Sequence, residues 1–195
     1  MAQPANDDCA GIIDLGDAPI CPSPVIYTNF NATTSDIGND NLPPCFNGAP
    51  ERDVWFSFTA TAAIANYEVS VIGAGGSPIV QPQVAVYRGN CGFDQLVLLD
   101  CATSATGDSE LTLNLAGLTP GITYFLRVND WSANNPNWGQ FELCIQEMVQ
   151  TEFTVNQTVA TCAVGLCMIR VVLREITATM KTIFLPFAQP THRLA

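Results

Sequence analysis

The residues best suited to chemistry lie in one short stretch, Asn129-Asp-Trp-Ser-Ala-Asn-Asn-Pro-Asn-Trp138. This stretch places two tryptophans among amides, so an indole ring could stack on a sugar while a neighbouring amide hydrogen-bonds to it. We name Trp131, Trp138, Asn129 and Asn135 as candidate ligand-binding residues. The alternative is that one or both indoles fold back as lids over the edge of the protein.

A second group of side chains, all carboxylates, could bind calcium through hard oxygen ligands. We name Asp8, Asp53 and Asp130 as the candidate ligands, because strand-end loops and the N-terminal segment could converge at one edge. No contiguous loop has the alternating Asp or Asn, the glycine and the distal Glu of an EF-hand. The alternative is that these carboxylates cap turns or lie solvated on loops. Calcium is the one cofactor that the sequence suggests.

Catalytic motifs are missing from the sequence, so we predict that the chain is not an enzyme. It has no Gly-x-Ser-x-Gly elbow and no His-Glu-x-x-His motif. The single histidine, His192, cannot alone supply a catalytic triad or a histidine-rich zinc site. The net charge of −11 repels phosphate backbones, which argues against nucleic acid as a partner. No apolar run reaches the length of about 20 residues that a membrane-spanning helix requires.

The cysteine content indicates an oxidising compartment. The chain has eight cysteines, at Cys9, Cys21, Cys45, Cys91, Cys101, Cys144, Cys162 and Cys167. Only the last two approach the spacing of metal ligands, and no second pair lies near them. An even number of cysteines in an acidic chain therefore favours disulfides over metal, and favours a secreted or cell-surface location.

The pairing of these cysteines can be predicted only in part. Cys91 and Cys101 bracket a short loop between two strands, and closing such a loop would stabilise the fold by roughly 3 kcal/mol. We therefore expect them to form a bridge. Sequence does not fix the remaining connectivity. The other expected pairs are Cys9 with Cys144 and Cys21 with Cys45, while Cys162 and Cys167 pair with each other or remain free.

Strands must position these side chains, because period-two alternation recurs between about residues 53 and 147. Val54, Phe56 and Phe58 alternate with other residues in one such run, where Trp55 is expected to pack. In the last run, Cys144 is out of phase with the apolar positions, so its partner should reach it from the outer face. Seven or eight short strands with turn-rich connections predict an all-β antiparallel sandwich, jelly-roll-like in preference to immunoglobulin-like.

A hairpin is predicted around Leu118-Thr-Pro-Gly121. Pro120 presets the first central position of a type II turn, and Gly121 supplies the positive φ that the second requires. The alternating runs on either side, 111–115 and 122–128, would then be neighbouring strands.

Charge divides the chain near residue 149. Residues 1–149 carry sixteen acidic and three basic side chains, a net charge of −13, whereas residues 150–195 carry two acidic and four basic ones, a net charge of +2. We therefore expect a sandwich domain over 1–149 and a C-terminal extension over 150–195. An added strand or helix, an interface segment and non-native sequence all stay open for the extension. Its apolar runs, 167–173 and 182–187, would favour self-association if it is folded.

Five ordered blocks of residues 5–147 resemble a secreted surface-protein domain of Bacteroidetes-type bacteria, similar to the bacterial pre-peptidase C-terminal domain. The blocks are Asn6-Asp-Asp-Cys-Ala10, Asp53-Val-Trp-Phe-Ser-Phe-Thr59, Val86-Tyr-Arg-Gly-Asn-Cys-Gly92 with Leu99-Asp-Cys101, Leu115-Ala-Gly-Leu-Thr-Pro-Gly-Ile-Thr-Tyr-Phe-Leu-Arg-Val128, and Gly139-Gln-Phe-Glu-Leu-Cys-Ile145. The resemblance implies a β-sandwich, export and a non-catalytic role. The family often carries an acidic pair where this chain has Ala102-Thr103, which weakens a cation role for that loop.

These observations predict a non-catalytic extracellular interaction, adhesion or accessory module of an exported bacterial protein. Its partners would be other domains of a surface protein, or a glycan or protein ligand. The alternative is a carbohydrate-binding module that uses the aromatic loop, with or without calcium.

Overall fold

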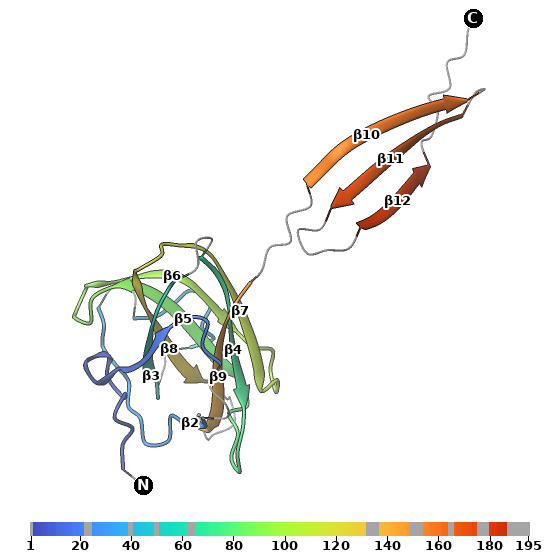
Figure 1. Cartoon of the computed structure of the whole chain (residues 1–195). Coiled ribbons are helices and arrows are strands. Elements are labelled where there is room, and N and C mark those ends of the chain that lie inside the picture. The colour runs from blue at the N-terminus through green and yellow to red at the C-terminus, as the bar shows by residue number, and fades with distance from the viewer. Residues whose placement is uncertain are drawn as a thin grey trace, which may run out of the picture. The chain divides into compact units, whose positions relative to one another are not determined.

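The structure, a computed structural model, describes the backbone and side chains of residues 2–21, 25–38, 41–48, 51–61, 66–131 and 137–148. It describes the backbone alone of residues 65, 154–163, 166–174 and 180–186. The chain divides into two compact units, Met1–Met148 and Val149–Ala195 (Figure 1).

The first unit is a sandwich of two β-sheets, which confirms the predicted fold class. Its elements are η1 (Cys9–Gly11), β1 (Ile13–Asp17), β2 (Tyr27–Thr28), β3 (Val54–Thr59), β4 (Ala65–Gly73), β5 (Pro82–Gly89), β6 (Leu96–Thr103), β7 (Glu110–Leu118), β8 (Thr123–Asp130) and β9 (Gln140–Glu147). One sheet has the strand order β1-β3-β8-β5-β6, and the other has the order β2-β9-β4-β7. β1 runs parallel to β3, whereas the other paired strands are antiparallel.

Alternating side chains of the two sheets fill the space between them. On β3, the rings of Phe56 and Phe58 are completely buried. Phe141 on β9 meets Phe56 edge-on, with 6.0 Å between ring centroids. On β7, every second residue from Leu111 to Leu115 is buried, as the alternation in the sequence predicted. This filling is the main apolar core of the molecule.

The predicted hairpin around Gly121 is wrong, because its two strands belong to different sheets. β7 pairs with β4, whereas β8 pairs with β3 and β5. The turn itself forms, since Gly121 has φ +79° and the Ile122 amide donates to the Thr119 carbonyl at 3.2 Å. Gly121 also donates to the carbonyl of Ala60, just beyond β3, at 2.7 Å. The chain therefore crosses from one sheet to the other, and β7 and β8 contribute to the same core from opposite sheets.

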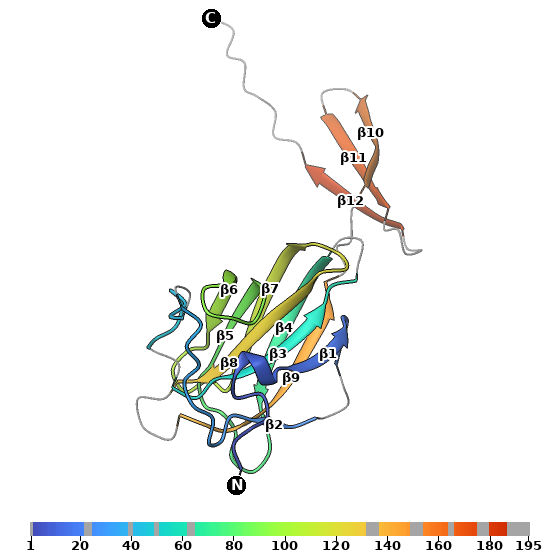
Figure 2. The same cartoon turned by 90° about the vertical axis from the view of Figure 1, so that its left-hand side faces the viewer.

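A layer of non-strand segments covers the outer face of the five-stranded sheet. Cys9, Ile37 and Phe46 from these segments form a second apolar cluster with Trp55 and Tyr87 of the sheet. Figure 2 shows η1 beside β3, which it contacts. Trp55 is completely buried, which confirms that it packs within the protein. β3 is therefore covered on both faces, whereas an exposed sheet would have a polar outer face.

Three disulfides tie distant segments together, and they correct the predicted pairing. The bridges are Cys9–Cys91, Cys21–Cys144 and Cys45–Cys101, with sequence separations of 82, 123 and 56 residues. The expected pairs Cys91–Cys101, Cys9–Cys144 and Cys21–Cys45 are therefore wrong. Two of the bridges join the covering layer to β6 or to the loop before it.

The covering layer explains why the short-range bridge does not form. Cys101 lies opposite Ala85 in the sheet, and both belong to the cluster on the outer face. Its sulfur therefore meets Cys45 of the covering layer. Cys144 follows the predicted rule, because its neighbour Ile145 faces the core and Cys144 must face outward. Its partner Cys21 lies directly across from it, with 4.5 Å between Cα atoms.

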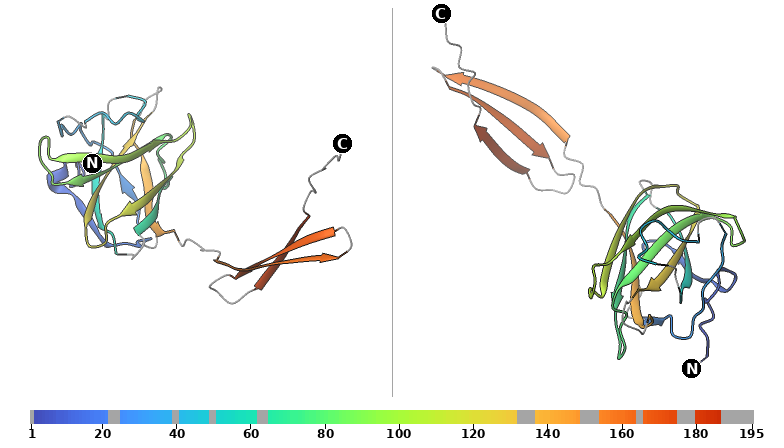
Figure 3. Two further views of the ribbon diagram at one scale, coloured as in Figure 1. Left: turned by 90° about the horizontal axis from the view of Figure 1, so that it is seen from above. Right: turned by 180° about the vertical axis from the view of Figure 1, so that it is seen from behind.

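The second unit contains a three-stranded antiparallel sheet, visible from two directions in Figure 3. Its strands are β10 (Thr154–Ala163), β11 (Leu166–Arg174) and β12 (Met180–Pro186), in that order across the sheet. The register places Cys162 opposite Cys167. A bond between these two cysteines remains a prediction. In the parts of the chain that the structure describes, no helix is long and apolar enough to cross a membrane.

Candidate functional site

A buried ion pair lies between the five-stranded sheet and the covering layer. The Arg127 Nε–H donates to Oδ2 of Asp53 at 2.9 Å, and both side chains are completely buried. The guanidinium carbon lies 5.3 Å from the centroid of the Trp55 ring, which adds a cation–π contact. The remaining guanidinium nitrogens donate to the carbonyls of Asn41 and Ser35, at 2.8 and 3.0 Å. Internal partners therefore surround the charge of Arg127.

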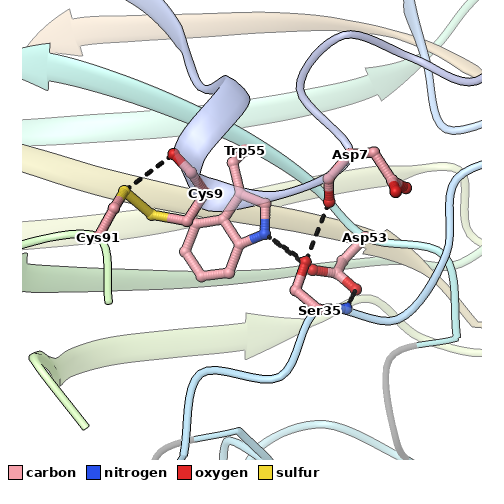
Figure 4. Close-up of a disulfide and its surroundings, with 6 residues drawn as sticks. All are labelled: Asp7, Cys9, Ser35, Asp53, Trp55 and Cys91. Atoms are coloured by element: carbon pink, nitrogen blue, oxygen red, sulfur yellow. Dashed lines mark hydrogen bonds between the residues drawn. A yellow bond between two sulfur atoms is a disulfide. The ribbon is translucent and has the colours of Figure 1, made fainter. Parts of the chain in front are cut away.

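Asp53 connects this ion pair to the N-terminal segments, and Figure 4 shows Asp53 beside Ser35 and Trp55. Its Oδ2 accepts the Trp55 Nε1–H at 2.9 Å, and its Oδ1 accepts the Ser35 amide at 3.0 Å. The Ser35 hydroxyl in turn donates to the carbonyl of Asp7 at 3.0 Å. The Asp7 carboxylate accepts the amide and hydroxyl of Thr33. These bonds hold two N-terminal segments against the sheet, which is a structural task.

The structure does not bring the three predicted calcium ligands together. Asp53 is part of the buried ion pair. Asp130 Oδ1 accepts the amides of Gln81 and Val80, at 2.8 and 3.1 Å, and Asp8 is exposed. Burial raises the pKa of Asp130 above its ordinary value, although the amides of Gln81 and Val80 act in the opposite direction. Within the described ranges, no three His, Cys, Asp or Glu side chains are placed to hold a metal ion.

A surface cavity of about 170 Å³ lies beside the Cys9–Cys91 bridge. Its lining includes Asp8, Asp36 and Phe93, all of them exposed. Among the residues that line it, no His or Lys accompanies the carboxylates. The cavity therefore combines negative charge with one aromatic ring.

The predicted aromatic loop is described at its two ends, while residues 132–136, including Asn135, lie outside the described residues. Trp131 is half-buried and lies against Gly48, where an added Cβ would be 2.4 Å from the indole ring. Asn129 was predicted to contact a ligand, but it is 1 % exposed and donates to Oε1 of Gln83 at 3.0 Å. Its Oδ1 has no hydrogen-bond partner among the described residues. Asn129 therefore belongs to the interior, which corrects its predicted role.

Trp138, at the other end of this loop, contacts residues that the sequence did not connect with it. Its ring meets Phe30 edge-to-face, with 4.4 Å between centroids and 82° between planes. Both rings are half-buried. Next to Trp138, Asn137 donates its Nδ2–H to Oε2 of the exposed Glu51 at 3.0 Å. Phe30, Glu51 and Trp138 are hereafter called the aromatic rim.

Asn29 joins the three segments that form this rim. It is buried, and its Nδ2 donates to the carbonyl of Arg52 at 2.8 Å and to that of Asn137 at 3.4 Å. Its Oδ1 accepts the amide of Gly139 at 2.8 Å. These contacts span up to 110 residues of sequence, so no local motif could have indicated them. The one available signal was the pair of amides flanking aromatic residues, Asn29-Phe30 and Asn137-Trp138.

No family model matches this chain, and no curated protein matches it.

Proposed function

We propose that residues 1–148 form a non-catalytic binding module of an exported protein. The observation that carries the proposal is the state of the buried ionisable side chains. The side chains of Asp7, Asp53, Arg127 and Asp130 all have hydrogen-bond or ion-pair partners within the protein. An acid–base or covalent mechanism needs such groups within reach of a substrate. In the described part of the chain, these ionisable side chains hold segments together.

The disulfides support an extracellular role for the module. Bonds that close 56 to 123 residues restrict the unfolded chain strongly and persist only where the surroundings are oxidising. The resemblance of five sequence blocks to secreted bacterial surface domains points the same way. We infer that the sandwich presents its loops to a glycan or protein, beside other domains of a surface protein.

The proposal can be tested with the full oxidised chain on immobilised glycans and proteins. We expect retention on at least one surface, with no release of sugar or peptide products into solution. If product release copurifies with the chain, the chain is an enzyme and the proposal is overturned. Failure to bind either class of surface would overturn it as well.

A further inference from the structure

We propose that the aromatic rim binds a neutral pyranose sugar, with Trp138 as the stacking surface and Glu51 as a hydrogen-bond acceptor. This inference rests on the proposed function and names the ligand class of the module. It also moves the site away from Trp131 and Asn129, which the sequence had included.

The rim is held rigidly before any ligand arrives. Asn29, next to Phe30, alone bonds to the two other segments that form the rim, as described above. The Thr28 hydroxyl adds a bond to the carbonyl of Gly139 at 3.0 Å and accepts the Phe30 amide at 3.1 Å. The Thr34 hydroxyl donates to the carbonyl of Glu51 at 3.2 Å. Because the supporting groups are already ordered, binding would cost little conformational entropy.

The pair formed by Phe30 and Trp138 offers an aromatic surface on which a sugar ring can stack. An indole combines a large apolar face with a polar N–H, which suits a ligand that is apolar on its ring face and polar at its edge. Phe30 fixes the orientation of Trp138 by the edge-to-face contact at 4.4 Å. Trp138 remains partly exposed. By contrast, Trp131 lies on the backbone of Gly48 and serves packing.

The polar partner of the platform is Glu51, whose side chain is exposed. Asn137 holds one carboxylate oxygen at 3.0 Å, which orients the group. A carboxylate accepts hydrogen bonds from hydroxyls, and such charge-assisted bonds are the stronger kind. The sugar must be neutral, because Glu51 and the net charge of −13 over residues 1–149 repel sulfated or uronic ligands.

The test measures binding of the full oxidised chain to soluble neutral oligosaccharides of glucose, xylose, mannose and N-acetylglucosamine, by calorimetry. For the oligosaccharide that binds, we expect Trp138→Ala to weaken affinity by roughly tenfold or more, as for other aromatic anchors. Glu51→Gln, at an exposed position, should keep the fold and weaken affinity by a smaller factor. Trp131→Phe is the matched control and should bind as the unchanged chain does. Near-ultraviolet circular dichroism checks that each variant is folded.

The outcomes separate this inference from the proposed function. If Glu51→Gln and Trp138→Ala are both folded and each binds as tightly as the unchanged chain, the aromatic rim is not the sugar site. Loss of binding in Trp131→Phe alone would do the same. If no oligosaccharide binds while a protein surface retains the chain, the sugar inference fails and the binding module stands. Hydrolysis of a bound oligosaccharide would overturn the proposed function.

Discussion

Arg127 on β8 and Asp53, the residue before β3, form an ion pair of 2.9 Å with neither side chain exposed to solvent. Charges this deep lose their hydration, so the pair contributes only while both partners and their other hydrogen bonds are present. The pair also reaches Ser35, Asn41 and Trp55, and it thus fastens the covering layer to the sheet.

Arg127→Met should therefore be strongly destabilising, because it leaves the Asp53 carboxylate buried without its cation. We expect a loss of about 3–5 kcal/mol in the free energy of unfolding, measured with guanidinium chloride. Arg88→Met is the control, since Arg88 is exposed, and it should change stability by less than about 0.5 kcal/mol. Similar losses in the two variants would mean that the buried pair has no special role.

The disulfide connectivity can be checked directly. Peptide mapping of the unreduced full chain by mass spectrometry should yield the linked peptides Cys9–Cys91, Cys21–Cys144 and Cys45–Cys101. Replacing Cys21 and Cys144 by alanine should remove about 4–5 kcal/mol on the chain-entropy model, since this bridge closes the longest loop. A peptide linking Cys91 to Cys101 would contradict the structure and restore the short-range pairing.

The strands could be predicted from the sequence, whereas their partners could not. Alternation in 111–115 and 122–128 is the same for a hairpin within one sheet as for two strands in opposite sheets of a sandwich. A signal for the covering layer was present, since Val54, Trp55 and Phe56 are large and apolar on both faces of β3. The pattern could not identify which segment supplies the cover, because that contact joins residues far apart in sequence.

The same reason limits prediction of the site. Sequence reasoning named Trp138 as a ligand-binding candidate, which stays a prediction, but it grouped Trp138 with Asn129, which lies on β8 and is buried. Phe30 and Glu51 were missed, because only the fold brings them to Trp138. The carboxylates proposed for calcium were selected by type, and the structure gives Asp53 and Asp130 other partners.

A substitution in the turn between β7 and β8 can measure the cost of a positive φ without a steric clash. Gly121 has φ +79°, and an added Cβ would meet no atom within 4 Å, so Gly121→Ala should act through conformation alone. We expect a loss of about 1–2 kcal/mol in the free energy of unfolding. Gly76→Ala is the matched control, because Gly76 is equally open and its φ lies outside the left-handed region. Equal effects of the two substitutions would argue against this turn geometry.

Asp130 should make stability depend on pH in an unusual direction for a carboxylate. Burial raises its pKa in the folded state above the ordinary value of 3.8. Between that value and the raised one, the folded chain keeps a proton that the unfolded chain has lost, so increasing pH favours unfolding. Its contribution is therefore fully present below pH 3.8 and disappears as the pH rises through the folded-state pKa.

Asp130→Asn isolates this effect, because the amide oxygen can still accept the bonds from Val80 and Gln81 while the side chain no longer titrates. Urea unfolding of the two proteins from about pH 3 to pH 7 gives the difference in stability at each pH, in which the other carboxylates cancel. We expect the unchanged chain to lose stability relative to the variant as the pH increases. A relative stability that increases with pH would mean that the bonds from the Gln81 and Val80 amides outweigh burial in setting the pKa of Asp130.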